Sequence, residues 1–226
     1  MHFHSPSPVV NIADCSWSEY FFQRIESYQN KAALIDGTDG RVITYTELKS
    51  QIHSVALSLQ QKGYVKGDVF AIYAPNSPEY VITFQAVMMI GGIITTANPL
   101  YTADELAKQL EHSNAVCLFT DPELLDKANL AIQSSNIREH YIFGQVDGVN
   151  AFDQLVQNNT DGQLIEVDID PEKDIAILPY SSGTTGLAKG VMLTHRNLVA
   201  HNIQGQNQVD ATNPSENDTL IWVAIP

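Results

Sequence analysis

The residues best suited to carry chemistry lie in one short segment, Tyr180–Gly190, which is rich in hydroxyls and glycines and contains a single lysine. This combination suits a polyphosphate, because hydroxyls donate hydrogen bonds, glycines leave backbone amides uncovered and Lys189 adds positive charge. A flexible surface turn is the alternative, but a lone lysine between two apolar stretches favours the phosphate site. The candidate binding residues are Ser181, Ser182, Gly183, Thr184, Thr185, Gly186 and Lys189.

The spacing around the lysine excludes a P-loop. That motif requires glycine directly before the lysine and serine or threonine directly after it, whereas Lys189 lies between Ala188 and Gly190. The residues that follow, Val191–Leu193, predict a strand where a P-loop would continue directly into a helix. The sequence also contains no G-x-G-x-x-G dinucleotide fingerprint.

Strand and helix signals alternate along the chain that must position this segment. Helices are predicted after the capping boxes Thr44/Glu47 and Thr102/Glu105, after Ser77-Pro78, over Pro122–Ser134 and Ala151–Val156, and after Thr194. Strands are predicted over Asp68–Ala74, Ile93–Ala97, Ala115–Thr120, His140–Phe143, Ile175–Pro179, Gly190–Leu193 and Thr219–Ile225. Because strands that alternate with helices at this spacing usually pair in parallel, the sequence predicts an α/β fold with parallel sheets flanked by helices.

The best candidate for a domain boundary is the polar segment Asn158–Lys173. It divides the chain into a first α/β subdomain with an N-terminal extension, residues 1–160, and the start of a second subdomain that carries the phosphate segment, residues 161–226. Acidic side chains cluster here and favour a solvated linker over a metal site, because they alternate with apolar residues as in an exposed strand edge. They are Asp161, Glu166, Asp168, Asp170, Glu172 and Asp174.

Composition limits the partners of the protein. The formal net charge of −14 disfavours binding to nucleic acid or to anionic membranes. The longest apolar run, near Ala86–Ile94, is interrupted by Gly91-Gly92 and is too short to cross a membrane. The first residues lack the basic and apolar regions of a secretory signal, which favours an intracellular protein, and Cys117 lies in an apolar run that favours a buried thiol.

The segment YSSGTTGLAKGVMLTHRN, residues 180–197, resembles the phosphate-loop signature of the adenylate-forming superfamily. That superfamily includes acyl-CoA synthetases, firefly-type luciferases and nonribosomal adenylation domains. Three further stretches, Ala74–Tyr80, Gly91–Pro99 and Glu105–Gln109, are most similar to the branch of 4-coumarate–CoA ligases and acyl-CoA synthetases. The resemblance extends from about the expected helix Trp17–Tyr28 onward, and Ala188 departs from it because many relatives have proline there.

The resemblance implies a two-step reaction with ATP, Mg²⁺ and coenzyme A. A carboxylic acid attacks the α-phosphate of ATP to give acyl-AMP, and the thiol of coenzyme A then displaces AMP. Six of the candidate residues named above would line the β- and γ-phosphates, namely Ser181, Ser182, Gly183, Thr184, Thr185 and Lys189. The resemblance places no catalytic residue and no metal ligand in this segment, and it implies a location in the cytoplasm or the peroxisome.

The resemblance also implies that the chain is an incomplete N-terminal domain, because the adenine, ribose and magnesium sites and the C-terminal domain of relatives lie beyond Pro226. The chain alone is therefore expected to be inactive. Two alternatives remain: a luciferase-like adenylating oxygenase, and a short non-catalytic nucleotide-binding protein. Next to the loop, we expect a structural role for His195 at a helix start and a surface ion pair between Arg196 and the acidic segment.

Overall fold

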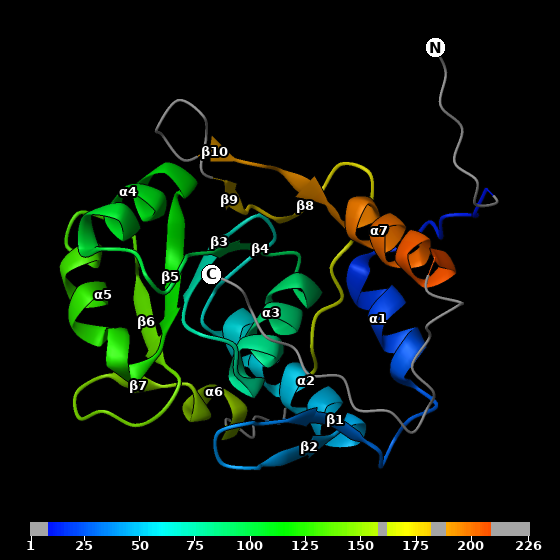
Figure 1. Ribbon diagram of the computed structural model, residues 1–226, viewed down its shortest axis with the longest axis horizontal. Coiled ribbons are helices and arrows are strands. Elements are labelled where there is room, and N and C mark those ends of the chain that lie inside the picture. Colours follow the sequence, from blue (N-terminus) through cyan, green and yellow to red (C-terminus); the bar gives the residue numbers. More distant parts are fainter. Residues whose placement is uncertain (1–8, 158–161, 182–188, 209–226) are drawn as a thin grey trace.

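The computed structural model describes residues 9–157, 162–181 and 189–208 (Figure 1). Its centre is a seven-stranded sheet with the strand order β11-β8-β4-β3-β5-β6-β7. The strands are β3 (Val69–Tyr73), β4 (Ile93–Thr96), β5 (Ala115–Thr120), β6 (Glu139–Ile142), β7 (Asn150–Ala151), β8 (Ile175–Ile177) and β11 (Leu193–Thr194). All neighbours pair in parallel except β11, which is antiparallel to β8. The predicted α/β fold with a parallel sheet is confirmed, with one antiparallel strand added at the edge.

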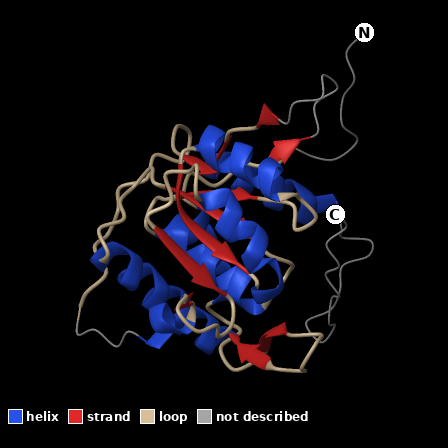
Figure 2. Ribbon diagram, turned by 90° about the vertical axis from the view of Figure 1, so that its left-hand side faces the viewer, coloured by secondary structure: helices blue, strands red, loops and turns tan. Residues whose placement is uncertain are grey.

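Helices cover both faces of this sheet (Figure 2). The helices of the described residues are α1 (Trp17–Ile25), α2 (Tyr45–Gln61), α3 (Pro78–Met89), α4 (Ala103–Ser113), α5 (Leu125–Ile132), α6 (Asp153–Gln157) and α7 (His195–Gln208), with a short 3-10 turn η1 (Pro122–Leu124) before α5. Helices α2 and α3 lie on one face and α4 and α5 on the other, and α1 lies beside α7 (Figure 1). Alternate residues of β3 separate the two faces: Phe70 and Ile72 pack in the core under α2 and α3, whereas Ala71 and Tyr73 pack in the core under α4 and α5. Because both faces are covered, β3 is buried along its whole length and shows no polar alternation.

Side-chain caps confirm the helix starts predicted at Thr44, Ser77 and Thr102, whereas the helix expected from Ala151 begins at Asp153 because Ala151 belongs to β7. At both predicted capping boxes the threonine hydroxyl accepts a hydrogen bond from the backbone three residues later, and the glutamate carboxylate accepts one from the threonine N–H. The Ser77 hydroxyl caps α3, with Pro78 at its first position. A further capping box, Ser16 with Glu19, begins α1.

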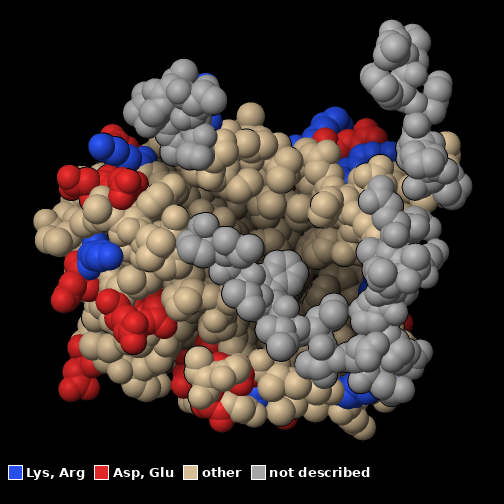
Figure 3. All heavy atoms as spheres, in the orientation of Figure 1, with Lys and Arg blue, Asp and Glu red and all other residues tan. Residues whose placement is uncertain are grey.

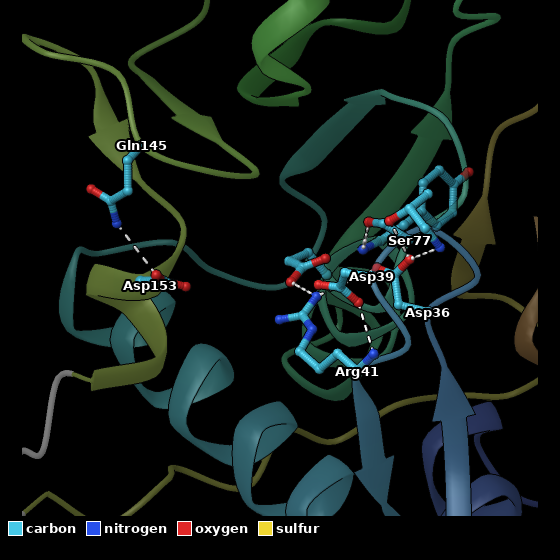
Figure 4. A network of polar contacts seen from close by, with 9 residues as sticks. Asp36, Asp39, Arg41, Ser77, Gln145 and Asp153 are labelled. Atoms are coloured by element: carbon cyan, nitrogen blue, oxygen red, sulfur yellow. Dashed lines mark hydrogen bonds and ion pairs between the residues drawn. The ribbon is translucent and has the colours of Figure 1, made fainter.

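An antiparallel hairpin, β1 (Ala32–Ile35) with β2 (Val42–Thr44), is absent from the sequence-based expectation. Its turn is closed by side chains, since Asp36 accepts hydrogen bonds from Thr38. Arg41 then ties the hairpin to the first turn of α3 through Glu79 (Figure 4). In the same view Gln145 donates to Asp153 at the start of α6, at 3.3 Å.

One strand predicted from the sequence is wrong. The sequence predicts a single strand over Gly190–Leu193, but the structure divides this run between two sheets. Strand β10 (Lys189–Gly190) pairs with β9 (Tyr180–Ser181), whereas β11 pairs with β8. Val191 and Met192, between the two strands, have exposed side chains. The chain changes sheet here, which an apolar run cannot reveal. The expected strand Thr219–Ile225 lies outside the described residues.

Candidate functional site

The ends of the phosphate segment are joined by the small hairpin β9–β10. Lys189 is the register partner of Ser181, and Gly190 is the partner of Tyr180. Both Ser181 and Lys189 are exposed, so a hydroxyl and an ammonium group project from neighbouring positions of the hairpin. Five other candidates, Ser182, Gly183, Thr184, Thr185 and Gly186, lie outside the described residues. The structure therefore brings together the two described members of the predicted set.

The hairpin follows the carboxyl end of the parallel sheet. After β8 the Leu178 N–H donates to the carbonyl of Ile94 at 2.7 Å, so the chain stays beside β4 until it enters β9. Ligands of open parallel sheets usually bind beyond the carboxyl ends of the strands. The candidate site has the position that this topology favours.

Tyr180 fills the base of the hairpin. A Cβ atom added at Gly190 would lie 3.2 Å from Cζ of Tyr180, so the ring lies directly over this glycine. The Tyr180 hydroxyl lies 2.6 Å from Nδ1 of His112, at the end of α4. Partial burial raises the pKa of the Tyr180 hydroxyl above its ordinary value, so it stays protonated at neutral pH.

The helix after the hairpin is anchored by His195, as expected for a structural residue. Its side chain is fully buried, and its Nδ1 accepts a hydrogen bond from the backbone N–H of Trp17 at 3.2 Å. Burial lowers the pKa of His195 to about 4. Arg196 lies 3.6 Å from the carboxylate of Glu172, so the predicted ion pair with the acidic segment is confirmed.

The acidic segment forms ion pairs with lysines in place of a metal site. Asp170 pairs with Lys173 at 2.6 Å, and Asp174 pairs with Lys66 at 2.5 Å. In the ranges that the structure describes, no group of three or more His, Cys, Asp or Glu side chains is arranged to hold a metal ion. The segment has no strand structure where it is described, so the expected strand edge is wrong.

Charge is unevenly distributed over the surface. Figure 3 shows acidic side chains on the side of α4 and α5, where Asp104, Glu111, Glu123 and Asp126 are exposed.

Across the described parts of the chain, no helix combines the length and the apolar character needed to cross a bilayer.

The described groups at the hairpin can bind an anion: Lys189 offers a charge and Ser181 a hydroxyl donor. Sequence reasoning missed three side chains that link α4 and β4 to the hairpin or to the residue just before it, namely Thr95, Gln109 and His112. Two of them, Thr95 and Gln109, lie within the stretches that carry the family resemblance, which was the available signal.

The fold and the loop define a class. A family model described as AMP-binding enzyme matches residues 21–226, and the chain belongs to this family of adenylate-forming enzymes.

Within the family the chain is similar to 4-coumarate–CoA ligases. It is 36% identical to 4-coumarate–CoA ligase 4 of Arabidopsis thaliana, over 89% of this chain and 37% of that protein. It is 38% identical to 4-coumarate–CoA ligase 2 of Petroselinum crispum, over 87% of this chain and 35% of that protein. The chain thus spans less than half the length of these curated relatives.

Solved structures agree with this assignment. A long-chain-fatty-acid–CoA ligase from Archaeoglobus fulgidus superposes with a TM-score of 0.82 and 25% identity, over 96% of this chain and 43% of that one. A luciferase-like enzyme from the nonluminescent mealworm Zophobas morio superposes with a TM-score of 0.75 and 26% identity, over 84% of this chain and 45% of that one.

Proposed function

We propose that this chain is part of an ATP-dependent acid–CoA ligase, and that the hairpin β9–β10 forms the base of its ATP phosphate site. The observation that carries the proposal is the pairing of Lys189 opposite Ser181, which places a cation and a hydroxyl side by side at the carboxyl end of the sheet. The 4-coumarate–CoA ligases among its relatives and the acyl-CoA ligase among its structural neighbours support the reaction class.

In this proposal Lys189 neutralises charge on the β- and γ-phosphates, and hydroxyls of Ser181 and its neighbours in the loop donate hydrogen bonds to their oxygens. Ser182, Thr184 and Thr185 are assigned this role as hydroxyl donors, and Gly183 and Gly186 leave backbone amides uncovered for the same phosphate oxygens. Mg²⁺ would enter on the phosphate oxygens of the nucleotide and reduce their charge. We retain the division into residues 1–160 and 161–226 as a proposal, with the loop in the second part.

The proposed reaction begins when a carboxylate oxygen of the acid attacks the α-phosphorus of ATP and pyrophosphate leaves. The sulfur of coenzyme A then forms the thioester bond, and AMP leaves. The hairpin contributes binding and orientation of the phosphates, which lowers the barrier without covalent chemistry. Aromatic and fatty acids are both candidate substrates, because both classes occur in the names of the similar proteins.

The test is pyrophosphate exchange in the protein encoded by the complete reading frame, assayed with a panel of aromatic and fatty acids. Lys189→Ala should lower kcat/KM for ATP by about tenfold or more, because a charge-assisted contact to phosphate contributes about 1.5–3 kcal/mol. Lys127→Ala is the matched control, since Lys127 is also an exposed lysine but lies on α5. Equal exchange in both variants would show that the hairpin does not hold the nucleotide.

A second candidate, a luciferase-like adenylating oxygenase, is favoured by the similarity to the Zophobas morio enzyme. Both candidates form an acyl-AMP, so pyrophosphate exchange does not separate them. Product analysis does: a coenzyme A thioester supports the ligase, whereas oxygen consumption with decarboxylation of the adenylate supports the oxygenase.

A further inference from the structure

We propose that the C-terminal part of α4 positions the hairpin β9–β10 through two side chains, His112 and Gln109, and that both are positioning residues for the phosphate site. This inference rests on the proposed function, because it assigns the hairpin to ATP. These residues lie about 70 positions before the hairpin and on the other side of the expected domain boundary. Neither would contact the nucleotide; each acts through another residue.

The first link joins His112 to Tyr180. Their rings meet edge to face with centroids 5.6 Å apart, and Nδ1 lies 2.6 Å from the tyrosine hydroxyl. The Tyr180 ring also packs closely on Gly190, since a Cβ atom added there would lie 3.2 Å from Cζ of the ring. The ring is therefore held between α4 and β10. Because Ser181 is the next residue, fixing Tyr180 fixes the start of the phosphate segment.

The second link passes from Gln109 through Thr95 to the chain just before the hairpin. The Gln109 amide donates to Thr95 Oγ1 at 2.9 Å, and the Thr95 hydroxyl donates to the carbonyl of Leu178 at 2.8 Å. The same amide donates to the carbonyl of Thr96 at 3.1 Å. Gln109 and Thr95 are both buried, so the hydrogen bonds of this relay compete little with water.

These two links act on neighbouring points from one helix. Gln109 and His112 are three residues apart in α4, so they lie on one face of the helix. They hold Leu178 and Tyr180, which flank Pro179 at the entrance to the hairpin. A helix surface thus sets the position and tilt of the segment that leads to Ser181.

The hairpin needs such support because it is very short. Each of its strands contains two residues, and an isolated two-stranded hairpin is only marginally stable in water. Backbone contacts attach it to the large sheet only at its base, where it continues into β8 and β11 and the Val191 N–H donates to the carbonyl of Pro179 at 2.9 Å, and side-chain contacts with α4 add to this attachment. Loss of the His112–Tyr180 contact should therefore let Lys189 and Ser181 move relative to bound ATP, which weakens ATP binding more than it slows the chemical step.

The experiment uses the protein from the complete reading frame and four variants: His112→Ala, His112→Asn, Tyr180→Phe and the double change His112→Ala with Tyr180→Phe. Asparagine retains an amide near the position of Nδ1, and phenylalanine retains the ring without the hydroxyl. His201→Ala is the control, because His201 is an exposed histidine on α7. Two readouts are taken: KM for ATP and kcat in pyrophosphate exchange, and hydrogen–deuterium exchange of peptides covering residues 178–181 and 189–191 without ATP.

The two single changes that remove the contact should each raise KM for ATP about two- to tenfold, with kcat changed less, because one hydrogen bond is lost. KM for ATP in the double variant should be no higher than in the more impaired of the two single variants, because both changes remove the same contact. His112→Asn should have a KM close to that of the parent. Deuterium uptake in both peptides should rise in His112→Ala and in Tyr180→Phe. Additive effects, or unchanged deuterium uptake, would overturn the positioning role. If Lys189→Ala leaves pyrophosphate exchange unchanged, the proposed function fails instead, and deuterium uptake still decides whether α4 holds the hairpin.

Discussion

At the scale of single residues, His195 is the titratable group most strongly removed from water near the site. Its ring is fully buried and accepts a hydrogen bond from Trp17 N–H, which joins α1 to the start of α7. Asp174 and Glu19 favour its protonated form, and Lys66 opposes it, but burial is the largest effect and lowers the pKa to about 4. The neutral ring is therefore the form that the fold requires.

This environment predicts a pH-dependent stability. In the unfolded chain the histidine pKa is about 6.5, so between about pH 6.5 and pH 4 the unfolded state binds the proton that the folded state refuses. Stability from His195 is fully present above pH 6.5 and is lost as the pH falls through this window, by up to about 3 kcal/mol. Urea unfolding of the parent and of His195→Asn, from about pH 7.5 to about pH 4.5, measures it.

Asparagine can still accept from Trp17 N–H but does not titrate, so the variant should lose less stability over the window than the parent. The comparison uses the change with pH, because the smaller side chain lowers stability at every pH. His140, whose pKa is also lowered to about 4, contributes equally to both proteins and cancels. Parallel pH curves for parent and variant would show that His195 binds its proton equally well in the folded and unfolded chains, which contradicts the lowered pKa.

At the scale of elements, α4 carries both side chains that we propose as positioning residues, so its own stability matters. Its N-terminus is closed by Thr102, whose hydroxyl accepts from Glu105 N–H at 3.3 Å, while the Glu105 carboxylate accepts from Thr102 N–H at 2.8 Å. Thr102→Ala should lower the free energy of unfolding by about 1 kcal/mol, because one end of the capping box is removed. Denaturant unfolding measures it, with Thr102→Ser as the matched variant that keeps the hydroxyl.

A serine variant as unstable as the alanine variant would assign the effect to the lost methyl group in place of the cap. The same pair of variants separates helix stability from the contacts of the hairpin. If α4 frays only at its first turn, Thr102→Ala leaves KM for ATP close to that of the parent, because Gln109 and His112 lie two turns further along.

Elements with local signals could be predicted from the sequence, whereas elements that depend on distant partners could not. The capping boxes, Ser77-Pro78 and the buried strands follow from residues within a few positions. The contact between α4 and the hairpin β9–β10 joins residues 68 positions apart, and an exposed polar residue such as His112 has no periodic pattern that indicates it. The split of Gly190–Leu193 between two sheets has the same cause, since the partner strands decide it.

At the scale of the whole molecule, the large sheet continues across the expected domain boundary. Strand β8, from the second part, pairs with β4 from the first, with Ile94 opposite Ile177. The acidic segment that leads into β8 is held in place by side chains from the first part of the chain. Gln60 forms two hydrogen bonds with the backbone of Ile165, at 2.8 and 2.9 Å. Two attachments therefore position the phosphate segment: the pairing of β8 with β4, and the hydrogen bonds that hold the linker before β8.

Lys66 is the charged attachment of that linker, and its removal tests how much the strap contributes. Its Nζ lies 2.5 Å from Asp174 and donates to the carbonyl of Asp168 at 2.7 Å. Lys66→Met keeps the apolar stem and removes both contacts. We expect a loss of about 1 kcal/mol, since the ion pair is partly exposed and exposed pairs contribute about 0–1 kcal/mol, while the carbonyl contact adds a hydrogen bond.

The measurements for Lys66→Met are urea unfolding at low and high salt and limited proteolysis with mapping of the first cuts. The difference in the free energy of unfolding between the parent and Lys66→Met should become smaller at high salt, because salt screens the ion pair in the parent. Proteolytic cleavage within residues 162–174 should be faster in the variant than in the parent. Lys127→Met is the control, as an equivalent change on exposed α5. If both variants are cut at the same rate, Lys66 does not hold the linker, and the pairing of β8 with β4 together with the Gln60 hydrogen bonds carries the phosphate segment to the edge of the sheet.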